Sequence, residues 1–104
     1  MIRFIPSEPD LIKAFDADNE IGEASFEIQG FYLNVKSVTA SDDIIAEGLI
    51  RSVLNYGANR GAYIAKVSKG IYGNVFRKLG FKGEGVLSAE IPEALTGSCC
   101  AGCN

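Results

Sequence analysis

Residues 41–81 read SDDIIAEGLIRSVLNYGANRGAYIAKVSKGIYGNVFRKLGF, and this stretch decides the fold. In its first half, polar side chains recur every four residues from Asp43 to Asn59, and apolar side chains follow the opposite phase. That period predicts a long amphipathic helix with a wide apolar face. Ser41 and the two aspartates after it are suited to cap the first N–H groups of the helix, and Gly61 is suited to a left-handed position at its end.

The second half of the stretch predicts a strand and another helix. The apolar run 62–67 is suited to a short strand that is covered on both faces. Residues 68–70 interrupt this run, and the apolar residues that follow recur at helical spacing up to Gly80. The expected order is therefore helix, buried strand, helix, and then a further strand, either from Phe81 onward or after a turn near Gly83.

This stretch resembles the GNAT superfamily of N-acetyltransferases. Three segments carry the resemblance: residues 49–54 in the long helix, Asn59-Arg60-Gly61 at its end, and residues 75–81, which read VFRKLGF. In that family a long helix with a similar RG ending is followed by a strand, a short helix and a YxKLGF-like ending. The resemblance covers roughly the central and C-terminal two-thirds of the chain. It implies an α+β fold, a small GNAT-like fold with a mixed, mainly antiparallel central sheet flanked by helices.

Before this stretch, the chain begins with a predicted strand and a predicted helix. Residues 1–5 read as a short strand that Pro6 ends. A capping serine at Ser7, a proline allowed in the first turn and a carboxylate three residues on predict the start of a short helix. In the resembled family, two N-terminal helices help to build the acceptor side, and the sequence here keeps about one. The side chains expected to point inward from it are Leu11, Ile12 and Phe15.

An antiparallel hairpin is expected after an acidic turn at residues 16–20. Apolar and polar side chains alternate in 21–28 and again in 31–39, with Gln29-Gly30 between the two runs. Such alternation predicts two strands that are each half buried. Residues 86–91 predict a final strand. The side chains expected on one face of the second hairpin strand are Phe31, Leu33 and Val35.

The resemblance also implies a site for acyl-coenzyme A. It places the cofactor where the strand at 31–40 splays from the strand at 62–67. Backbone groups of the first strand would hold the pantetheine arm, and the start of the long helix would meet the pyrophosphate. A primary amine, on a small molecule or a peptide, would attack the thioester. The cofactor-binding residues implied in this way are Val38, Thr39, Ala40, Ala46, Glu47 and Lys69.

Two positions depart from the motifs of the family. The family has a glycine-rich loop, similar to Q/R-x-x-G-x-G/A, whose N–H groups bind the pyrophosphate before the long helix. Residues 41–46 read SDDIIA instead, without a glycine or a basic residue, and their two aspartates would repel a phosphate. The tyrosine that the family places near the end of the short helix is Phe76 here. Tyr72, one helical turn earlier, is therefore the candidate catalytic acid, and a structural tyrosine is the alternative.

Composition bounds the class of protein. The chain has 104 residues, 47% of them hydrophobic, which is enough for one domain with a modest core. A net charge of −3 argues against a nucleic-acid partner. We find no run that is apolar and long enough to span a membrane, and no signal peptide is apparent. The absence of histidine excludes His-based catalytic triads and His metal ligands.

All three cysteines lie at the end of the chain, as Cys99, Cys100 and Cys103. The C-x-x-C spacing with a third cysteine adjacent predicts a soft-metal site or a reversible disulfide, and inert thiols on a disordered tail are the alternative. Three thiolates leave a zinc site one ligand short. The sequence thus divides into a domain over 1–96 and a cysteine-rich tail over 97–104. Free thiols and the missing signal peptide predict a cytoplasmic protein.

Two functions stay open at this point. The first is an acyl-coenzyme A-dependent N-acetyltransferase with a small-molecule or peptide amine as acceptor. The second is a catalytically inactive binding module of the same fold, whose cysteine tail binds a metal or acts in thiol redox chemistry. Neither function involves a nucleic acid or a membrane. The strand at 1–5 or the final strand could pair with a second copy, so a homo-oligomer also stays open.

Overall fold

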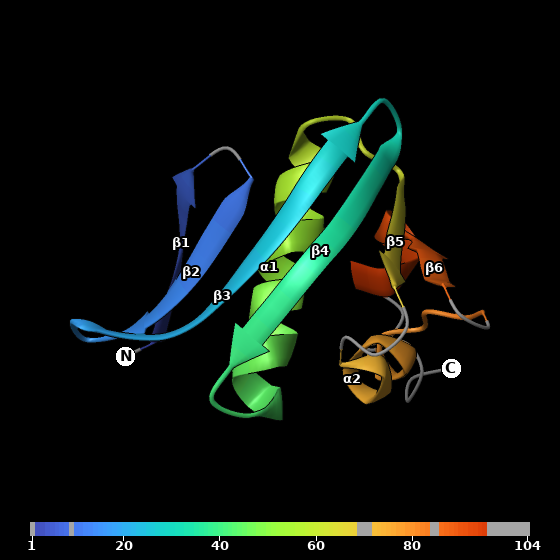
Figure 1. Ribbon diagram of the computed structural model, residues 1–104. Coiled ribbons are helices and arrows are strands. Elements are labelled where there is room, and N and C mark those ends of the chain that lie inside the picture. Colours follow the sequence, from blue (N-terminus) through green and yellow to red (C-terminus); the bar gives the residue numbers. More distant parts are fainter. Residues whose placement is uncertain (1, 9, 69–71, 84–85, 96–104) are drawn as a thin grey trace.

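The computed structural model describes residues 2–8, 10–68, 72–83 and 86–95 (Figure 1). A short helical segment over 91–95 follows the last strand. Along the chain the strands and helices are β1 (Ile2–Glu8), β2 (Leu11–Asp16), β3 (Asn19–Gln29), β4 (Tyr32–Ala40), α1 (Asp43–Asn59), β5 (Ile64–Ser68), α2 (Gly73–Lys78) and β6 (Val86–Glu90).

The described strands form one six-stranded sheet in sequence order, β1-β2-β3-β4-β5-β6. β4 and β5 are parallel, and each of the other neighbouring pairs is antiparallel. α1 lies across one face of this sheet and contacts β1, β2, β3 and β4 (Figure 1). The predicted α+β fold, with a mixed and mainly antiparallel sheet flanked by helices, is therefore confirmed.

The core lies between α1 and the sheet. Phe26 of β3 is fully buried, and its ring packs edge to face against Tyr56 of α1 with the ring centroids 5.4 Å apart. Gly48 lets β1 approach α1, because a Cβ at that position would collide with the ring of Phe4. No polar or charged side chain among the described residues is buried. The predicted apolar face of the helix is confirmed by its buried residues, Ile45, Ala46, Leu49, Ile50, Val53, Leu54 and Gly57.

The prediction of a helix that starts at Ser7 is wrong, because residues 11–16 form β2. Ile12 and Ala14 are buried against the α1 side, whereas Lys13 between them is half-buried on the other side, so the burial alternates as in a strand. β1 also continues through Pro6, which an edge strand tolerates. Pairing with β1 and β3 on its two sides decides the conformation of β2 over its local capping signals.

The predicted hairpin of β3 and β4 is confirmed, with one irregularity. Ser25 pairs with Ser37 and the next residue, Phe26, pairs with Val35, so Lys36 is an extra residue in β4. This bulge shifts the phase of the buried side chains, which are Leu33 and Val35 before it and Val38 after it. Phe31 was expected to share the face of Leu33, but it lies in the turn before β4 and is 71% exposed.

The strand predicted at 62–67 is covered on one face rather than on both. Ala65 and Val67 of β5 are buried on the α1 side, but Lys66 between them is only half-buried. The same alternation places polar side chains of β3, β4 and β6 on this second face. We call it the open face, and its half-buried polar residues are Glu23, Ser25, Glu27, Asn34, Lys66 and Ser88.

Candidate functional site

β4 and β5 separate part of the way along their length. They pair from Tyr32 and Ile64 to Val35 and Val67, and the bulge at Lys36 follows directly. In the described residues, β4 then continues to its end paired with β3 only, and β5 stops one residue after Val67. The pairing therefore ends where the resemblance implies that these two strands splay. The part of β4 beyond it carries three of the predicted cofactor-binding residues, Val38, Thr39 and Ala40.

Tyr72 lies where β4 ends. Its hydroxyl donates a hydrogen bond to the carbonyl oxygen of Ala40 at 3.2 Å, so the structure brings these two predicted site residues together. Tyr72 precedes α2 with a φ of 43°, in the left-handed region that residues other than glycine rarely adopt. Phe76 is fully buried and packs against Phe81 with ring centroids 4.9 Å apart. Phe76 is therefore a core residue, and its ring has no proton to donate.

Asp42 caps the N-terminus of α1, as the sequence predicts for this segment. Its Oδ1 accepts a hydrogen bond from the N–H of Ile45 at 2.9 Å. Its backbone carbonyl accepts the N–H of Ala46 at 3.0 Å, which closes the first turn of the helix. The carboxylate of Asp42 therefore occupies a position that an external anion would need at this helix end.

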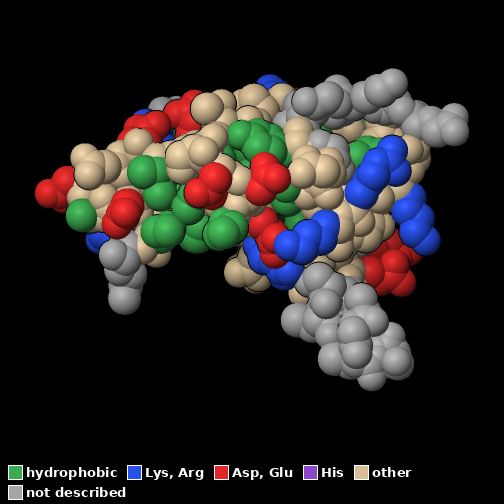
Figure 2. All heavy atoms as spheres, turned by 90° about the horizontal axis from the view of Figure 1, so that it is seen from below, with side chains coloured by type: hydrophobic (Ala, Val, Ile, Leu, Met, Phe, Trp, Pro, Cys, Tyr) green, Lys and Arg blue, Asp and Glu red, His purple; other side chains and the backbone are tan. Residues whose placement is uncertain are grey.

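Two polar contacts join the start of α1 to α2. Asn74 donates to Asp43 Oδ2 at 3.1 Å, and Lys78 Nζ donates to Glu47 Oε1, also at 3.1 Å. We call this set of four residues the clasp. The groove between the two helices has a volume of about 110 Å³. Figure 2 looks onto the lower end of the molecule in Figure 1 and shows acidic and basic side chains side by side.

The start of α1 does not fit a pyrophosphate. Asp42, Asp43 and Glu47 bring negative charge to the place where the phosphate groups would lie. The nearby cation of Lys78 is already bound by Glu47. The unpaired part of β4, in contrast, fits an extended arm that contains amide groups, because a strand edge offers both N–H and C=O groups to such a chain. Among the described residues, the edge of β4 therefore fits the pantetheine arm of coenzyme A better than the start of α1 fits its pyrophosphate.

The ion pairs of Glu47 predict a pH-dependent contribution to stability. The hydrogen bond from Lys78, with a further one from Arg51, holds the pKa of the Glu47 carboxyl below its ordinary value. A lowered pKa in the folded state stabilises the protein above the pKa of the unfolded state, and this contribution is lost as the pH falls through the folded-state pKa. We expect Glu47→Gln to destabilise the protein by up to about 1 kcal/mol at neutral pH and by progressively less as the pH falls through the folded-state pKa of Glu47.

Urea unfolding of both proteins at several pH values measures this difference. Glu27→Gln is the matched control, because Glu27 forms a longer, more exposed ion pair with Lys36 at 3.6 Å. A difference between Glu47→Gln and the parent protein that stays constant with pH would contradict the assignment.

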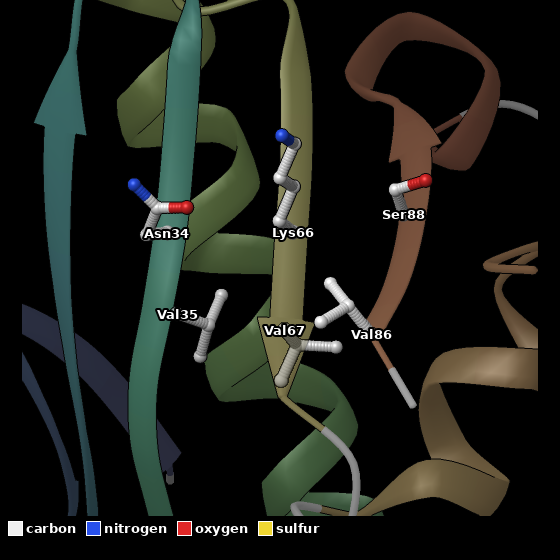
Figure 3. A pocket seen from close by; sticks show the side chains of 6 residues that line it. All are labelled: Asn34, Val35, Lys66, Val67, Val86 and Ser88. Atoms are coloured by element: carbon white, nitrogen blue, oxygen red, sulfur yellow. The ribbon is translucent and has the colours of Figure 1, made fainter. Parts of the chain in front are cut away.

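A groove of about 520 Å³ lies on the open face beside the separation of β4 and β5 (Figure 3). It runs over β4, β5 and β6, and polar and apolar side chains both contribute to it. The sequence does not reveal this groove, because it predicts that the run at 62–67, with Lys66 in it, is a strand covered on both faces. The residues that line it are Asn34, Val35, Lys66, Val67, Val86 and Ser88.

The sequence matches no protein-family model and no curated protein. Comparison of the fold with solved structures shows that it is the fold of GNAT acetyltransferases. The aminoglycoside 6'-N-acetyltransferase from Enterococcus faecium superposes with a TM-score of 0.70 at 13% identity, over 82% of this chain and 77% of that one.

Two further neighbours were solved with coenzyme A. The PaiA N-acetyltransferase from Thermoplasma acidophilum, in complex with coenzyme A, has a TM-score of 0.68 at 14% identity and covers 78% of this chain and 61% of its own. N-acetylglutamate synthase from Neisseria gonorrhoeae, complexed with coenzyme A and N-acetyl-glutamate, has a TM-score of 0.71 at 10% identity. That comparison covers 85% of this chain and 29% of the synthase chain. At these identities, the likeness defines the fold.

Several predicted site residues lie outside the described residues. Among 2–8, 10–68, 72–83 and 86–95, no group of three or more cysteine or carboxylate side chains could hold a metal ion. No helix in these segments is both long enough and apolar enough to cross a membrane. The predicted residues outside the described part are Lys69, Cys99, Cys100 and Cys103.

Proposed function

We propose that this protein is an acyl-coenzyme A-dependent N-acetyltransferase that acts on a small amine. The observation that carries the proposal is the separation of β4 from β5 after Val35 and Val67, with the Tyr72 hydroxyl at the end of the unpaired β4 edge. An extended arm can bind along such an edge and reach a proton donor. Neighbours of the same fold that were solved with coenzyme A support this proposal.

In this proposal, different residues bind the donor, admit the acceptor and transfer the proton. Backbone groups of Val38, Thr39 and Ala40 hold the pantetheine arm. The acceptor amine enters through the groove on the open face. When bound, the coenzyme would supply an acyl thioester. The acceptor nitrogen would then form a bond to the carbonyl carbon, and the bond between that carbon and the sulfur would break. Tyr72 would supply the proton that the leaving thiolate takes up, and the proton lost by the acylated nitrogen would restore the Tyr72 hydroxyl, so that no proton is gained or lost overall.

The phosphate groups contribute little in this proposal. Ala46 and Glu47 lie at the start of α1, where the N–H of Ala46 is bonded within the helix and the carboxylate of Glu47 is held by Lys78. Lys69 stays the candidate for a phosphate contact, outside the described residues. The protein is therefore expected to recognise its donor chiefly through the pantetheine arm.

Calorimetric titration with acetyl-coenzyme A and, separately, with acetyl-pantetheine tests the proposal. We expect both to bind with dissociation constants in the micromolar range, within about tenfold of each other, which corresponds to about 1.4 kcal/mol. In Asp43→Asn/Glu47→Gln, acetyl-coenzyme A should bind several-fold more tightly and acetyl-pantetheine unchanged, because only the first carries phosphates. Binding of neither compound up to about 1 mM would refute the acyltransferase function.

A second candidate function is a binding module of this fold without catalysis. The observation that favours it is the acidic, clasped start of α1, together with the apolar Phe76 in place of a tyrosine. In this candidate, Cys99, Cys100 and Cys103 bind a metal or undergo thiol redox chemistry. A chain that ends at residue 96 separates the two functions. It should lose zinc uptake if the module is correct, and it should keep donor binding if the transferase is correct.

A further inference from the structure

We infer that the groove on the open face is an acceptor site for an amine that also carries a carboxylate, and that Lys66, Asn34 and Ser88 bind this carboxylate. The inference deepens the proposed function, because it names the class of acceptor. The claim that the ligand's amine is acylated rests on the proposed function. The claim that the groove binds a carboxylate does not, because binding of a carboxylate can be measured without turnover.

Three neighbouring strands bring the polar residues of the groove into one row. Asn34 of β4 pairs with Lys66 of β5, and Lys66 pairs with Ser88 of β6, so the three residues form one row across the sheet. Their side chains line the same groove (Figure 3). Neighbouring strands lie about 4.8 Å apart, so the row spans about 10 Å. An amide, an ammonium and a hydroxyl group thus offer hydrogen-bond donors to one ligand.

The charge of Lys66 carries the second step. Its ammonium nitrogen lies 4.4 Å from the centroid of the Tyr32 ring, a cation–π contact that holds the ammonium toward the start of β4 and β5 (Figure 3). The structure gives Lys66 no carboxylate partner among the described ion pairs. A half-buried cation that has no ion-pair partner among the residues the structure describes favours an anionic ligand.

The neighbouring carboxylates on the same face are bound elsewhere. Glu27, which pairs with Asn34 across β3 and β4, contacts Lys36 at 3.6 Å and accepts a hydrogen bond from Gln29 at 2.9 Å. Glu90 of β6 accepts a hydrogen bond from the hydroxyl of Tyr63 at 3.1 Å. Neither carboxylate forms a described ion pair with Lys66, although Glu90 keeps its negative charge on the same face.

The position of the row relative to the separated strands carries the third step. Lys66 comes directly before Val67, the last residue of β5 that pairs with β4. One to two residues along a strand correspond to about 3–7 Å. An acceptor whose carboxylate reaches the Lys66 ammonium, beside the Tyr32 ring at the start of β4, needs its amine several ångströms away to reach the point where the strands part. Short peptides and amino acids with an amine on the side chain have such a spacing between the two groups.

Acyl transfer to matched acceptors tests the inference. The probes are amino acids and their carboxamides, which differ in the charge of one group and in the pKa of the amine, so kcat/KM is compared per unprotonated amine. We expect the parent protein to prefer the carboxylates by about tenfold or more in kcat/KM. Lys66→Met should lose this preference and Lys66→Arg should keep most of it. Lys36→Met, which removes a lysine outside the groove, is the matched control and should keep the preference. An equal rate with carboxylates and carboxamides in the parent protein would overturn the inference.

A binding measurement keeps the test independent of turnover. N-acetylglycine and its amide, which resemble the product, are titrated while the backbone amide resonances of Asn34, Lys66 and Ser88 are followed by NMR. We expect shifts with N-acetylglycine that are lost in Lys66→Met and weak or absent with the amide. This result together with a failed donor titration would remove the transferase function and leave the carboxylate site. Equal binding of both compounds, or an acetyl group found on Lys66 after incubation with acetyl-coenzyme A, would refute the site as an acceptor subsite.

Discussion

Phe26→Ala is expected to lower the free energy of unfolding by about 3–5 kcal/mol. Phe26 is fully buried on β3 beneath α1, and its ring contacts Tyr56 edge to face at 5.4 Å. Alanine would remove the apolar contacts on both sides and leave a cavity between the helix and the sheet, which the closely packed core can refill only in part. Because domains of this size are stable by only about 5–15 kcal/mol, a large share of the stability would be lost.

Urea unfolding followed by circular dichroism measures this effect. Phe31→Ala is the matched control, since it removes the same side chain from a turn where Phe31 is 71% exposed. We expect that control to change the free energy of unfolding by no more than about 0.5 kcal/mol. Similar losses in the two variants would show that Phe26 is not the centre of the core.

Tyr72→Phe is expected to lower kcat for acyl transfer by about 100-fold while leaving donor binding nearly unchanged. The ring stays in place against the core, whereas the hydroxyl that lies 3.2 Å from the Ala40 carbonyl oxygen is lost. If this hydroxyl protonates the departing thiolate, its removal raises the barrier of the chemical step alone. The lost hydrogen bond should cost only about 1 kcal/mol of stability.

Release of free thiol from acetyl-coenzyme A, measured with a saturating acceptor, gives kcat for this comparison. Tyr63→Phe is the control, because the Tyr63 hydroxyl bonds to Glu90 and not to β4. That control should keep the parent kcat. A Tyr72→Phe variant with the parent kcat would remove Tyr72 from the role of catalytic acid, and the donor titration would still decide whether the protein binds coenzyme A.

The local sequence was sufficient for some elements and not for others. α1 was predictable because its apolar residues keep a helical period over 17 residues and an aspartate caps its start. The hairpin of β3 and β4 was predictable from alternation. β2 was not, because Leu11, Ile12 and Phe15 fit a helix as well as a strand, and only pairing with β1 and β3 separates the two.

The candidate site was predictable only in outline. Local periodicity predicts the order of helix, strand and helix. The resemblance to a known family then indicates where two strands separate and makes Tyr72 the candidate acid. It did not give the hydrogen bond between Tyr72 and Ala40, the clasp of Asp43 with Asn74, or the ion pair of Glu47 with Lys78. The partners in each of these contacts lie about 30 residues apart, and the sequence holds no local signal that joins them.

The sequence by itself therefore determined the class of fold, the core face of α1 and the acidic start of that helix, because these depend on residues within a few turns or strand positions of one another. Only the tertiary structure decided the strand at β2, the end of the pairing between β4 and β5, and the row of Asn34, Lys66 and Ser88. The physical reason is that a sheet is held by hydrogen bonds between distant segments. Its register decides which side chains meet on a face, and a single extra residue at Lys36 changes that register.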